Sequence, residues 1–266
     1  MRKLFRTINS LLNADGSKGQ KFQMLLRFIW VQLRFLLRKE FVFKWVNNTK
    51  LYAIQHRTSS TLCYYMGLFD PEEMSLIRDS IKPGDVFIDV GANIGSYSIF
   101  AASYGAEVYS FEPVPSTFEL LERNIGLNPS IKERIHPVRK VISDKDGEVS
   151  FTTDNDTTNK IVTNSNSHTK STGLARIPAV TLDSEVEKAN FIKIDVEGFE
   201  KSVLGGAKRL LSSKELKLIV LEEPDDEIIS ILNYYDFSQC RYDCKTRQIR
   251  IVKGRQLKQN GIFVRQ

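Results

Sequence analysis

The sequence is poor in cysteine and histidine. Its three cysteines, Cys63, Cys240 and Cys244, are too few for a disulfide framework. Cys240 and Cys244 are separated by three residues and have no histidine beside them, which is not the spacing of a zinc site. We therefore expect reduced thiols in a cytoplasmic protein, and we assign no residue as a metal ligand.

The sequence also lacks a long run of apolar residues. Its most hydrophobic segment, residues 22–37, is broken by Arg27 and Arg34, whereas a membrane-spanning helix needs about 20 predominantly apolar residues. The first dozen residues have neither the apolar stretch nor the cleavage site of a secretory signal. We therefore expect no spanning helix and no signal peptide. With 41% hydrophobic and 10% aromatic residues, the 266-residue chain can still bury a substantial core.

Acidic residues are nearly missing from the start of the chain. Residues 1–50 hold eleven Lys and Arg against Asp15 and Glu40, a net charge of +9 that leaves −3 for all the other residues. The total of +6 is therefore a property of the first segment rather than of the body of the protein. Nucleic-acid binding requires Lys and Arg spread over the binding face, so we expect no nucleic-acid partner.

Residues 22–38 have the pattern of an amphipathic helix. At about 100° per residue, three arginines fall on one side and four aliphatic residues on the other, namely Arg27, Arg34 and Arg38 against Leu25, Ile29, Leu33 and Leu36. One interpretation is that the apolar side packs against the protein's own body. The other is peripheral attachment to the inner membrane surface, with Phe28, Trp30 and Phe35 near the interface.

A small β-hairpin is expected after this helix. Residues 41–46 and 51–54 have the composition of strands, and Asn47-Asn48 suits the turn between them. Asp70 is then placed to cap a second helix. We divide the chain into a basic extension, residues 1–69, and a main domain, residues 70–266.

Strand and helix patterns alternate through the main domain. Apolar runs suited to strands lie at residues 86–90, 107–111, 135–142, 191–194 and 216–221, and three short strands near the end at residues 239–244, 248–252 and 261–264. Such alternation predicts an α/β fold with a parallel, doubly wound sheet. The ligand site of such a sheet lies at the carboxyl ends of its strands.

The first of these strands leads into a glycine-rich loop, in which Gly91 and Gly95 allow a tight turn and close approach of a ligand. Glu112 ends the next strand, 21 positions after Gly91, where a carboxylate accepts both hydroxyls of a ribose. Asn93 replaces a glycine of the dinucleotide pattern. Asp89 would repel a pyrophosphate but attract an ammonium and a sulfonium. The loop thus favours S-adenosylmethionine over NAD. NAD-dependent oxidoreductases share the same arrangement of glycine loop and strand-end acid, so an oxidoreductase stays a weaker alternative.

Three sequence blocks resemble the class I methyltransferases of the FkbM family, namely residues 88–95, 111–113 and 192–200. The resemblance implies a Rossmann-like, mostly parallel sheet of seven strands with a terminal antiparallel hairpin, preceded here by the amphipathic helix and the small hairpin. It also implies S-adenosylmethionine-dependent O-methylation of hydroxyls on sugars, glycans or other small molecules.

The resemblance further implies which residues bind the cofactor. The methionine end would be lined by Asp89, Gly91, Ala92, Asn93 and Gly95. Glu112, followed by Pro113, would hold the ribose, and Ser143 and Asp144 would meet the adenine.

Acidic residues also follow the later strands. Asp195, Glu197 and Glu222 are expected at the same rim as the glycine loop, because neighbouring parallel strands end at one edge. Asp195 is the first candidate for a general base and Glu197 the second, with His168 as an outside candidate from a loop. Lys193 is expected on the other side of its strand. A divalent ion between Asp195 and Glu222 is compatible with the sequence but not required by it.

Other interpretations stay open. The acids at this rim would alternatively cap helices or hold a sulfonium electrostatically. Residues 152–173, rich in Ser, Thr and Asn, are either a substrate lid or a surface insertion. Besides a methyltransferase with a small-molecule or glycan acceptor, the sequence leaves a nucleic-acid methyltransferase and a non-catalytic nucleoside-binding module as alternatives.

Overall fold

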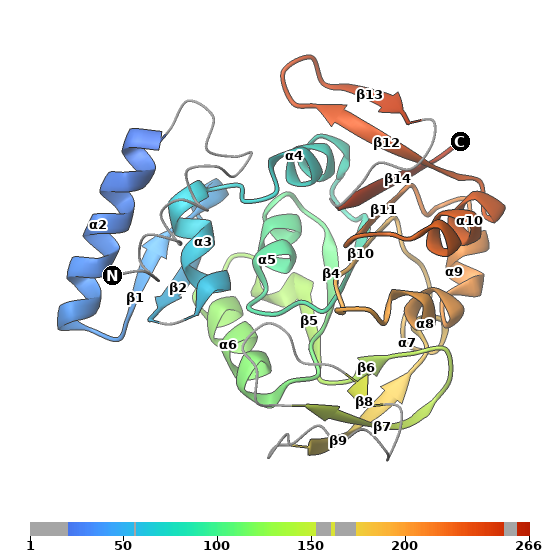
Figure 1. Ribbon diagram of the computed structural model, residues 1–266, viewed down its shortest axis with the longest axis horizontal. Helices are drawn as coiled ribbons and strands as arrows, with labels where there is room; N and C mark the ends of the chain where they lie inside the picture. The colour runs from blue at the N-terminus through green and yellow to red at the C-terminus, as the bar shows by residue number, and fades with distance from the viewer. Residues whose placement is uncertain (1–20, 56, 153–160, 163–173, 253–259) are drawn as a thin grey trace.

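The computed structural model describes residues 21–55, 57–152, 161–162, 174–252 and 260–266 (Figure 1). Within them the chain forms one large sheet with helices on both faces, a smaller sheet, and a two-stranded hairpin near the start. His168, most of the expected lid and the first 20 residues lie outside the described ranges.

The large sheet has the strand order β13-β12-β14-β11-β10-β3-β4-β5. Five neighbouring strands run parallel, namely β3 (Val86–Val90), β4 (Glu107–Phe111), β5 (Ile135–Val138), β10 (Phe191–Ile194) and β11 (Leu218–Leu221). Three antiparallel strands complete it, namely β12 (Phe237–Asp243), β13 (Gln248–Ile251) and β14 (Gly261–Arg265). The predicted α/β, doubly wound fold is confirmed. The described sheet has eight strands rather than the expected seven, because β13 pairs with the outer side of β12.

Both faces of the parallel strands are buried, which explains their nearly continuous apolar sequences. Phe87 and Phe191 pack into one hydrophobic cluster, and their neighbours Ile88 and Ile192 into the other. The first cluster lies under α4 (Pro71–Ser80), α5 (Ser96–Ser103) and α6 (Pro115–Gly126). The second lies under α7 (Leu182–Glu185), α8 (Glu200–Gly205), α9 (Lys208–Ser212) and α10 (Asp226–Tyr234).

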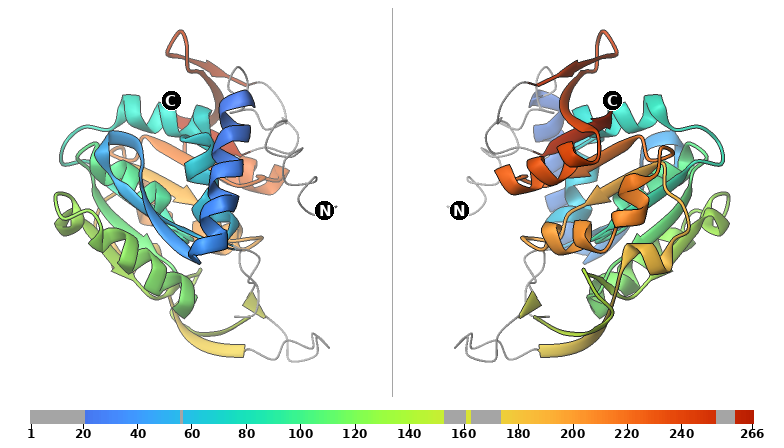
Figure 2. Two further views of the ribbon diagram at one scale, coloured as in Figure 1. Left: turned by 90° about the vertical axis from the view of Figure 1, so that its left-hand side faces the viewer. Right: turned by 90° about the vertical axis from the view of Figure 1, so that its right-hand side faces the viewer.

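The smaller sheet projects from the main body below β5 (Figures 1 and 2). It contains β6 (Val141–Ile142), β7 (Gly147–Thr152), β8 (Ile161–Val162) and β9 (Leu174–Val180). The expected pairing of residues 148–151 with residues 175–180 is confirmed. The prediction of a single strand over residues 135–142 is wrong. The pairing of β5 with β4 ends at Val138, and the next strand, β6, pairs with β9 in the smaller sheet. The local sequence does not signal this change of sheet.

The start of the described chain is α2 (Lys21–Leu37), followed by β1 (Glu40–Lys44), β2 (Lys50–Ile54) and α3 (Thr58–Met66). The predicted hairpin is confirmed, with its turn through a short 3-10 segment at Val46–Asn48 where Asn47 and Asn48 have positive φ angles. A second 3-10 turn, Lys132–Arg134, precedes β5. No described helix is long and apolar enough to span a membrane.

α2 does pack against the body of the protein, but through a different side from the expected one. Its buried residues are Met24, Phe28, Val31 and Phe35, whereas Ile29, Leu33 and Leu36 are exposed. Aromatic packing decides this: Phe28 contacts Tyr65 and Phe35 contacts Phe41. The expectation that Phe28 and Phe35 lie at a membrane interface is therefore wrong.

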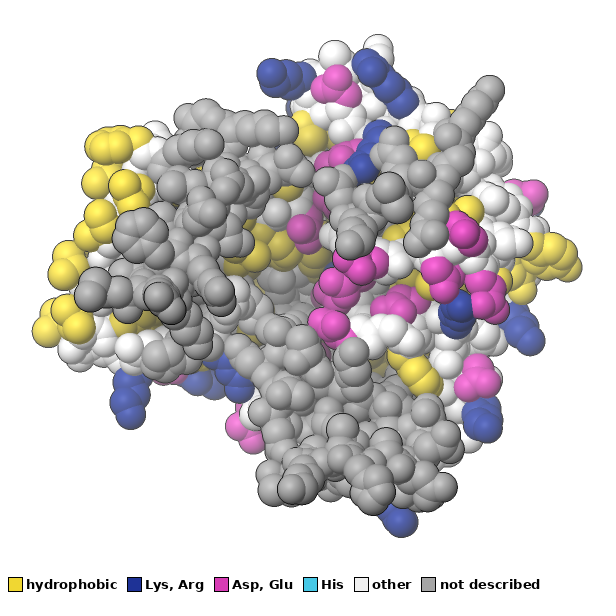
Figure 3. Space-filling view, viewed as in Figure 1, with side chains coloured by type: hydrophobic (Ala, Val, Ile, Leu, Met, Phe, Trp, Pro, Cys, Tyr) yellow, Lys and Arg dark blue, Asp and Glu magenta, His cyan; other side chains and the backbone are white. Residues whose placement is uncertain are grey.

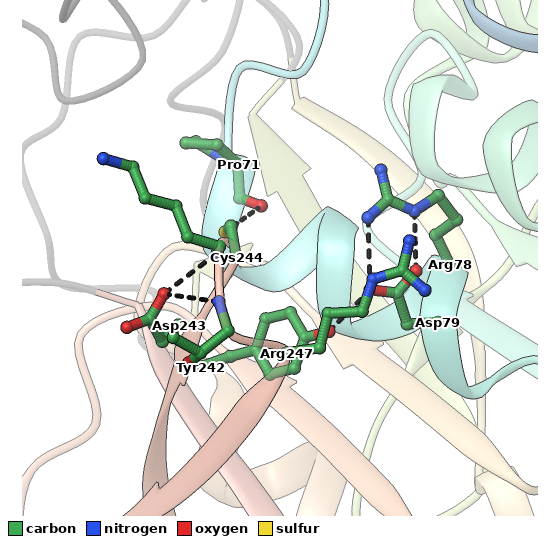
Figure 4. Close-up of polar contacts among 9 residues, drawn as sticks. Pro71, Arg78, Asp79, Tyr242, Asp243, Cys244 and Arg247 are labelled. Atoms are coloured by element: carbon green, nitrogen blue, oxygen red, sulfur yellow. Dashed lines mark hydrogen bonds and ion pairs between the residues drawn. The ribbon is translucent and has the colours of Figure 1, made fainter.

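The β12–β13 hairpin is fastened to α4 (Figure 4). The Tyr242 hydroxyl donates to the Asp79 carboxylate, which also accepts from the Arg78 guanidinium at 2.8 Å. The hydrogen bonds from Arg78 and Tyr242 lower the pKa of Asp79 to about 2 despite its partial burial. The backbone N–H of Tyr242 bonds to Glu72 at the start of α4. These contacts hold the first turn of α4, and with it Asp70, beside the sheet.

Candidate active site

The glycine loop at the end of β3 is shaped by close backbone contact with the segment after β10. Gly91 has φ +76°, and a Cβ atom there would lie 1.9 Å from the backbone oxygen of Asp195. Gly95 has φ +83°, and its Cβ would lie 2.4 Å from the Leu121 side chain. The N–H groups of Gly91 and Ala92 both donate to the Phe111 carbonyl. The Asp195 backbone leaves room only for glycine at position 91, and the positive φ angles favour glycine at both positions.

Glu112 lies directly beside this loop. Its two carboxylate oxygens accept 2.9 Å hydrogen bonds from the backbone N–H groups of Asn93 and Val114, and the side chain is buried just before the half-buried Pro113. Burial raises the pKa of Glu112 to about 7, although the two N–H groups act in the opposite direction. Glu112 and the glycine loop, which the sequence assigned to one ligand, are thus in direct contact, whereas the contact of Glu112 with a ribose stays a prediction.

Lys193 is the cation at the centre of the site, and the expectation that it points away from the site is wrong. In the parallel pairing of β10 with β3, Lys193 lies opposite Asp89, so the two side chains share one face of the sheet. Its ammonium lies 2.9 Å from Asp195 Oδ2, 3.9 Å from Asp89 Oδ1 and 5.0 Å from the Tyr97 ring centroid. Burial lowers the pKa of Lys193, but the surrounding carboxylates outweigh it, and the net pKa lies above its usual value.

Asp89 is completely buried beneath the loop. Its Oδ2 accepts a 2.6 Å hydrogen bond from the Ser98 hydroxyl on α5, and Ser98 in turn accepts from Ser110 on β4. Burial raises the pKa of Asp89, and the nearby Lys193 opposes that shift. Lys193 and the serine pair thus offset part of the cost of burying this carboxyl below the loop.

Asp70 and Tyr97 also belong to the site, and sequence reasoning missed this role. The Tyr97 hydroxyl donates to Asp70 Oδ2 at 2.8 Å, so Asp70 does not use its side chain to cap α4. Burial raises the pKa of Asp70, and the charge of Lys193 counteracts it. The position of Tyr97, two residues after Gly95, was the one available signal, because the first turn of that helix faces the site.

Asp195 and its acidic neighbours lie at the open rim. The Asp195 side chain is 42% exposed. Burial raises its pKa, but Lys193 and a hydrogen bond with Glu222 outweigh that contribution and leave the pKa below its ordinary value. Burial and the adjacent Asp195 raise the pKa of Glu222. The pKa of Asp195 therefore lies below that of Glu222, and Asp195 is the more readily ionised of the two.

Within the described ranges, Asp195, Glu197 and Glu222 also have the spacing of a cation site, with carboxylate oxygens within 4.8 Å of one another. Glu197 reaches this position from a backbone with positive φ, directly before Gly198. The three acids that the sequence predicted at one rim are thus brought together.

Ser143 and Asp144 follow β6 instead of a strand of the large sheet. The Ser143 N–H donates to the Val180 carbonyl, and its hydroxyl bonds to Asp144. Both residues pack against the end of α8, where a Cβ on Gly206 would lie 2.0 Å from the Ser143 oxygen. Their contact with adenine stays a prediction, and so does the role of His168.

The site as a whole fits a cationic nucleoside. Acidic side chains gather at the centre of the face shown in Figure 3, and Lys193 is the buried cation among them. Two buried oxygens, Asp89 Oδ1 and Asn93 Oδ1, accept no hydrogen bond. Ammonium and hydroxyl groups of S-adenosylmethionine are donors of the kind these oxygens lack, and its net positive charge suits the acids.

The raised pKa of Glu112, together with its predicted contact with the ribose, leads us to expect a cofactor affinity that depends on pH. Ribose hydroxyls donate best to an ionised carboxylate, and in the free protein Glu112 is protonated below about pH 7. We expect the affinity for S-adenosylhomocysteine to fall by up to about tenfold per pH unit below pH 7 and to level off above it. Isothermal titration calorimetry across this range measures the effect. Glu112→Gln should bind S-adenosylhomocysteine weakly, with an affinity that does not change over this pH range. If the affinity of that variant fell with pH as steeply as that of the wild type, the assignment of Glu112 to the ribose would be contradicted.

Comparisons with known proteins were made against families, curated sequences and solved structures. Residues 89–243 match the methyltransferase FkbM domain. The chain is 30% identical over 155 residues to the hexuronic acid methyltransferase AglP of Haloferax volcanii, which is 56% of this chain and 61% of that protein. It is 48% identical over 46 residues to the 31-O-demethyl-FK506 methyltransferase FkbM of Streptomyces tacrolimicus, 16% of this chain and 18% of that protein.

The chain therefore spans about three fifths of the first relative and about a fifth of the second. Among solved structures, the methyltransferase FkbM from Methylobacillus flagellatus aligns with a TM-score of 0.48 at 16% identity, over 70% of this chain and 45% of that one. The matched domain covers more than half of the present sequence and contains both the glycine loop and the Asp195 rim. This chain is a member of the FkbM methyltransferase family.

Proposed function

We propose that this protein is an S-adenosylmethionine-dependent O-methyltransferase whose acceptor is a hydroxyl of a sugar or glycan. The observation that carries the proposal is the contact between Gly91 and Asp195, which puts an ionised, solvent-accessible carboxylate against a loop suited to a cationic nucleoside. When bound, S-adenosylmethionine supplies a methyl group from its sulfonium. Glu112, Asn93 and the loop backbone would hold the cofactor.

Asp195 is the group we assign to the acceptor hydroxyl. Its carboxylate would accept the hydroxyl hydrogen and turn an oxygen lone pair toward the methyl carbon. A weak base is sufficient here, because the oxygen becomes strongly acidic as the new C–O bond forms and the C–S bond breaks. The proton then passes to Asp195, and the products are a methyl ether and S-adenosylhomocysteine. Glu197 is the second candidate for this role.

The acceptor class draws support from the named relative. AglP is named for a hexuronic acid, and this chain is 30% identical to it over 155 residues. The test is incubation of the purified protein with isotopically labelled S-adenosylmethionine and uronic-acid glycosides, followed by mass spectrometry. A labelled methyl ether on the sugar supports the proposal. Label that appears on a carboxyl as an ester, or on no acceptor while S-adenosylhomocysteine binds, would reject O-methylation of sugar hydroxyls.

Lys193 has a testable part in this proposal as a positioning residue. Because Lys193 lowers the pKa of Asp195, its removal should raise that pKa and move the acidic limb of the kcat–pH profile to higher pH. Lys193→Met should show this displacement, and Lys193→Arg, which keeps the charge, should show less of it. A purely structural lysine would lower the rate equally at every pH.

A divalent metal is not needed in this scheme. The Lys193 ammonium already lies 2.9 Å from Asp195 Oδ2 and supplies positive charge there. A metal ion would have to compete with this ammonium for the same carboxylate. We expect activity to survive dialysis against a strong chelator and to change less than about twofold on addition of Mg²⁺. Loss of turnover on chelation, restored by Mg²⁺, would instead assign the trio of Asp195, Glu197 and Glu222 to a metal.

We also propose a cytoplasmic location and no nucleic-acid substrate. The three cysteines are free thiols, of which Cys63 and Cys240 are buried, and burial raises their pKa. Unpaired thiols suit a reducing compartment. The acidic rim around Asp195 would repel a phosphate backbone.

A further inference from the structure

One side of α2 remains apolar and uncovered in the described structure. Six side chains form it, and we call it the outer α2 face: Phe22, Leu26, Ile29, Leu33, Leu36 and Leu37. Their exposed fractions lie between 47% and 87%. Figure 3 shows hydrophobic side chains gathered along the edge of the molecule where Figure 1 places α2.

The outer α2 face does not serve the protein's own core. At about 100° per residue it is centred on Leu33 and is about 100° wide, directly opposite Met24, Phe28, Val31 and Phe35. Those four residues are buried and already hold the helix to the body of the protein. A helix that is apolar on two opposite sides has a second apolar surface to cover.

The charges beside this face indicate an anionic partner. Arg34 follows the outer α2 face around the helix, Arg38 and Lys39 come directly after the helix ends at Leu37, and all three side chains are exposed. The Arg34 guanidinium stacks 4.2 Å from the Trp30 ring centroid, which places it at the boundary between apolar and polar surface. Glu40, the acid next in sequence, is in an ion pair with Arg123. Residues 1–50 carry +9, against −3 for the rest of the chain.

We propose that the outer α2 face docks on an anionic phospholipid bilayer, with α2 lying in the plane of the interface. Apolar side chains would enter the acyl boundary, and Arg34, Arg38 and Lys39 would meet lipid phosphates. No described helix can span a bilayer, so attachment through this face is peripheral. The face includes Ile29, Leu33 and Leu36, three of the four residues that the sequence pattern places opposite the arginines. The proposal requires no methyl transfer, so it stands or falls separately from the proposed function.

The test is sedimentation of the full chain with vesicles. Wild-type protein should bind vesicles of phosphatidylglycerol and phosphatidylcholine, bind pure phosphatidylcholine more weakly, and lose affinity with added salt. Replacement of three leucines, Leu26→Gln, Leu33→Gln and Leu37→Gln, should weaken binding about a hundredfold. These residues are exposed, so the fold should be retained, which an unchanged melting temperature would verify.

A matched control removes equally exposed apolar side chains elsewhere. Tyr234→Gln, Ile249→Thr and Ile251→Thr alter residues of α10 and β13, and vesicle binding should stay unchanged. Equal vesicle binding by the leucine variant and the wild type would overturn the proposal. So would sedimentation equilibrium showing a wild-type dimer that the leucine substitutions dissociate, with no vesicle binding, because a second copy would then occupy this face.

Discussion

Asp195→Asn is expected to lose about two to four orders of magnitude in kcat while keeping its affinity for S-adenosylhomocysteine within a few fold. The amide has nearly the same shape but accepts no proton, and it cannot hold the acceptor hydroxyl as an ionised carboxylate does. The loop backbone and Glu112, which we assign to the cofactor, do not depend on this side chain. Single-turnover kinetics with labelled cofactor and calorimetry with S-adenosylhomocysteine measure the two quantities.

The matched control is Asp236→Asn. Asp236 also pairs with a lysine, Lys214, at 3.2 Å, but both of these side chains are largely exposed. The control changes charge in the same way and should leave kcat and melting temperature nearly unaffected. If Asp195→Asn retained wild-type turnover, the assignment of Asp195 as the base would be wrong, and its role would be to cap or to attract the cofactor.

Gly91→Ala is expected to destabilise the protein by about 3 to 5 kcal/mol and to abolish cofactor binding. Part of this cost is the positive φ of +76°, and the larger part is the contact of the new Cβ with the Asp195 carbonyl at 1.9 Å. Both elements are main chain of the buried sheet, so neither moves without breaking the hydrogen bond from Asp195 N–H to the Val90 carbonyl. Differential scanning calorimetry should show a melting temperature lower by about 10 °C.

Gly84→Ala separates the two contributions. Gly84 has φ +87°, and a Cβ there meets nothing within 4 Å. The substitution should therefore cost only the backbone strain, about 1 kcal/mol, with cofactor binding intact. Equal destabilisation by the two variants would show that the close approach of Gly91 to Asp195 has no energetic consequence.

The strand ends of the parallel sheet could be predicted from the sequence. Apolar runs buried on both faces have a distinctive composition, and parallel strands necessarily end at one edge. This was enough to place Asp195, Glu197 and Glu222 together, and to expect a ligand at Gly91. Strand limits were less predictable: residues 135–142 form one apolar pattern, but β5 and β6 pair in different sheets.

The prediction for Lys193 failed for an identifiable reason. A charged residue within an apolar strand suggests a side chain that points to solvent, away from the ligand. The register of β10 against β3 instead puts Lys193 beside Asp89, and the charge pairing offsets part of the cost of burying the two groups. Register depends on the whole sheet, because pairing is decided by contacts far apart in the sequence.

The sequence by itself determined the α/β architecture, the glycine loop, the strand-end carboxylates and the uneven distribution of charge, because these depend on composition and on short spacings along the chain. Only the tertiary structure decided which side of α2 is buried, that Lys193 neutralises the site, and that Asp70 meets Tyr97. The physical reason is the same in each case. A helix with two apolar sides, a buried lysine and a capping acid each have more than one favourable environment, and packing against distant segments selects one of them.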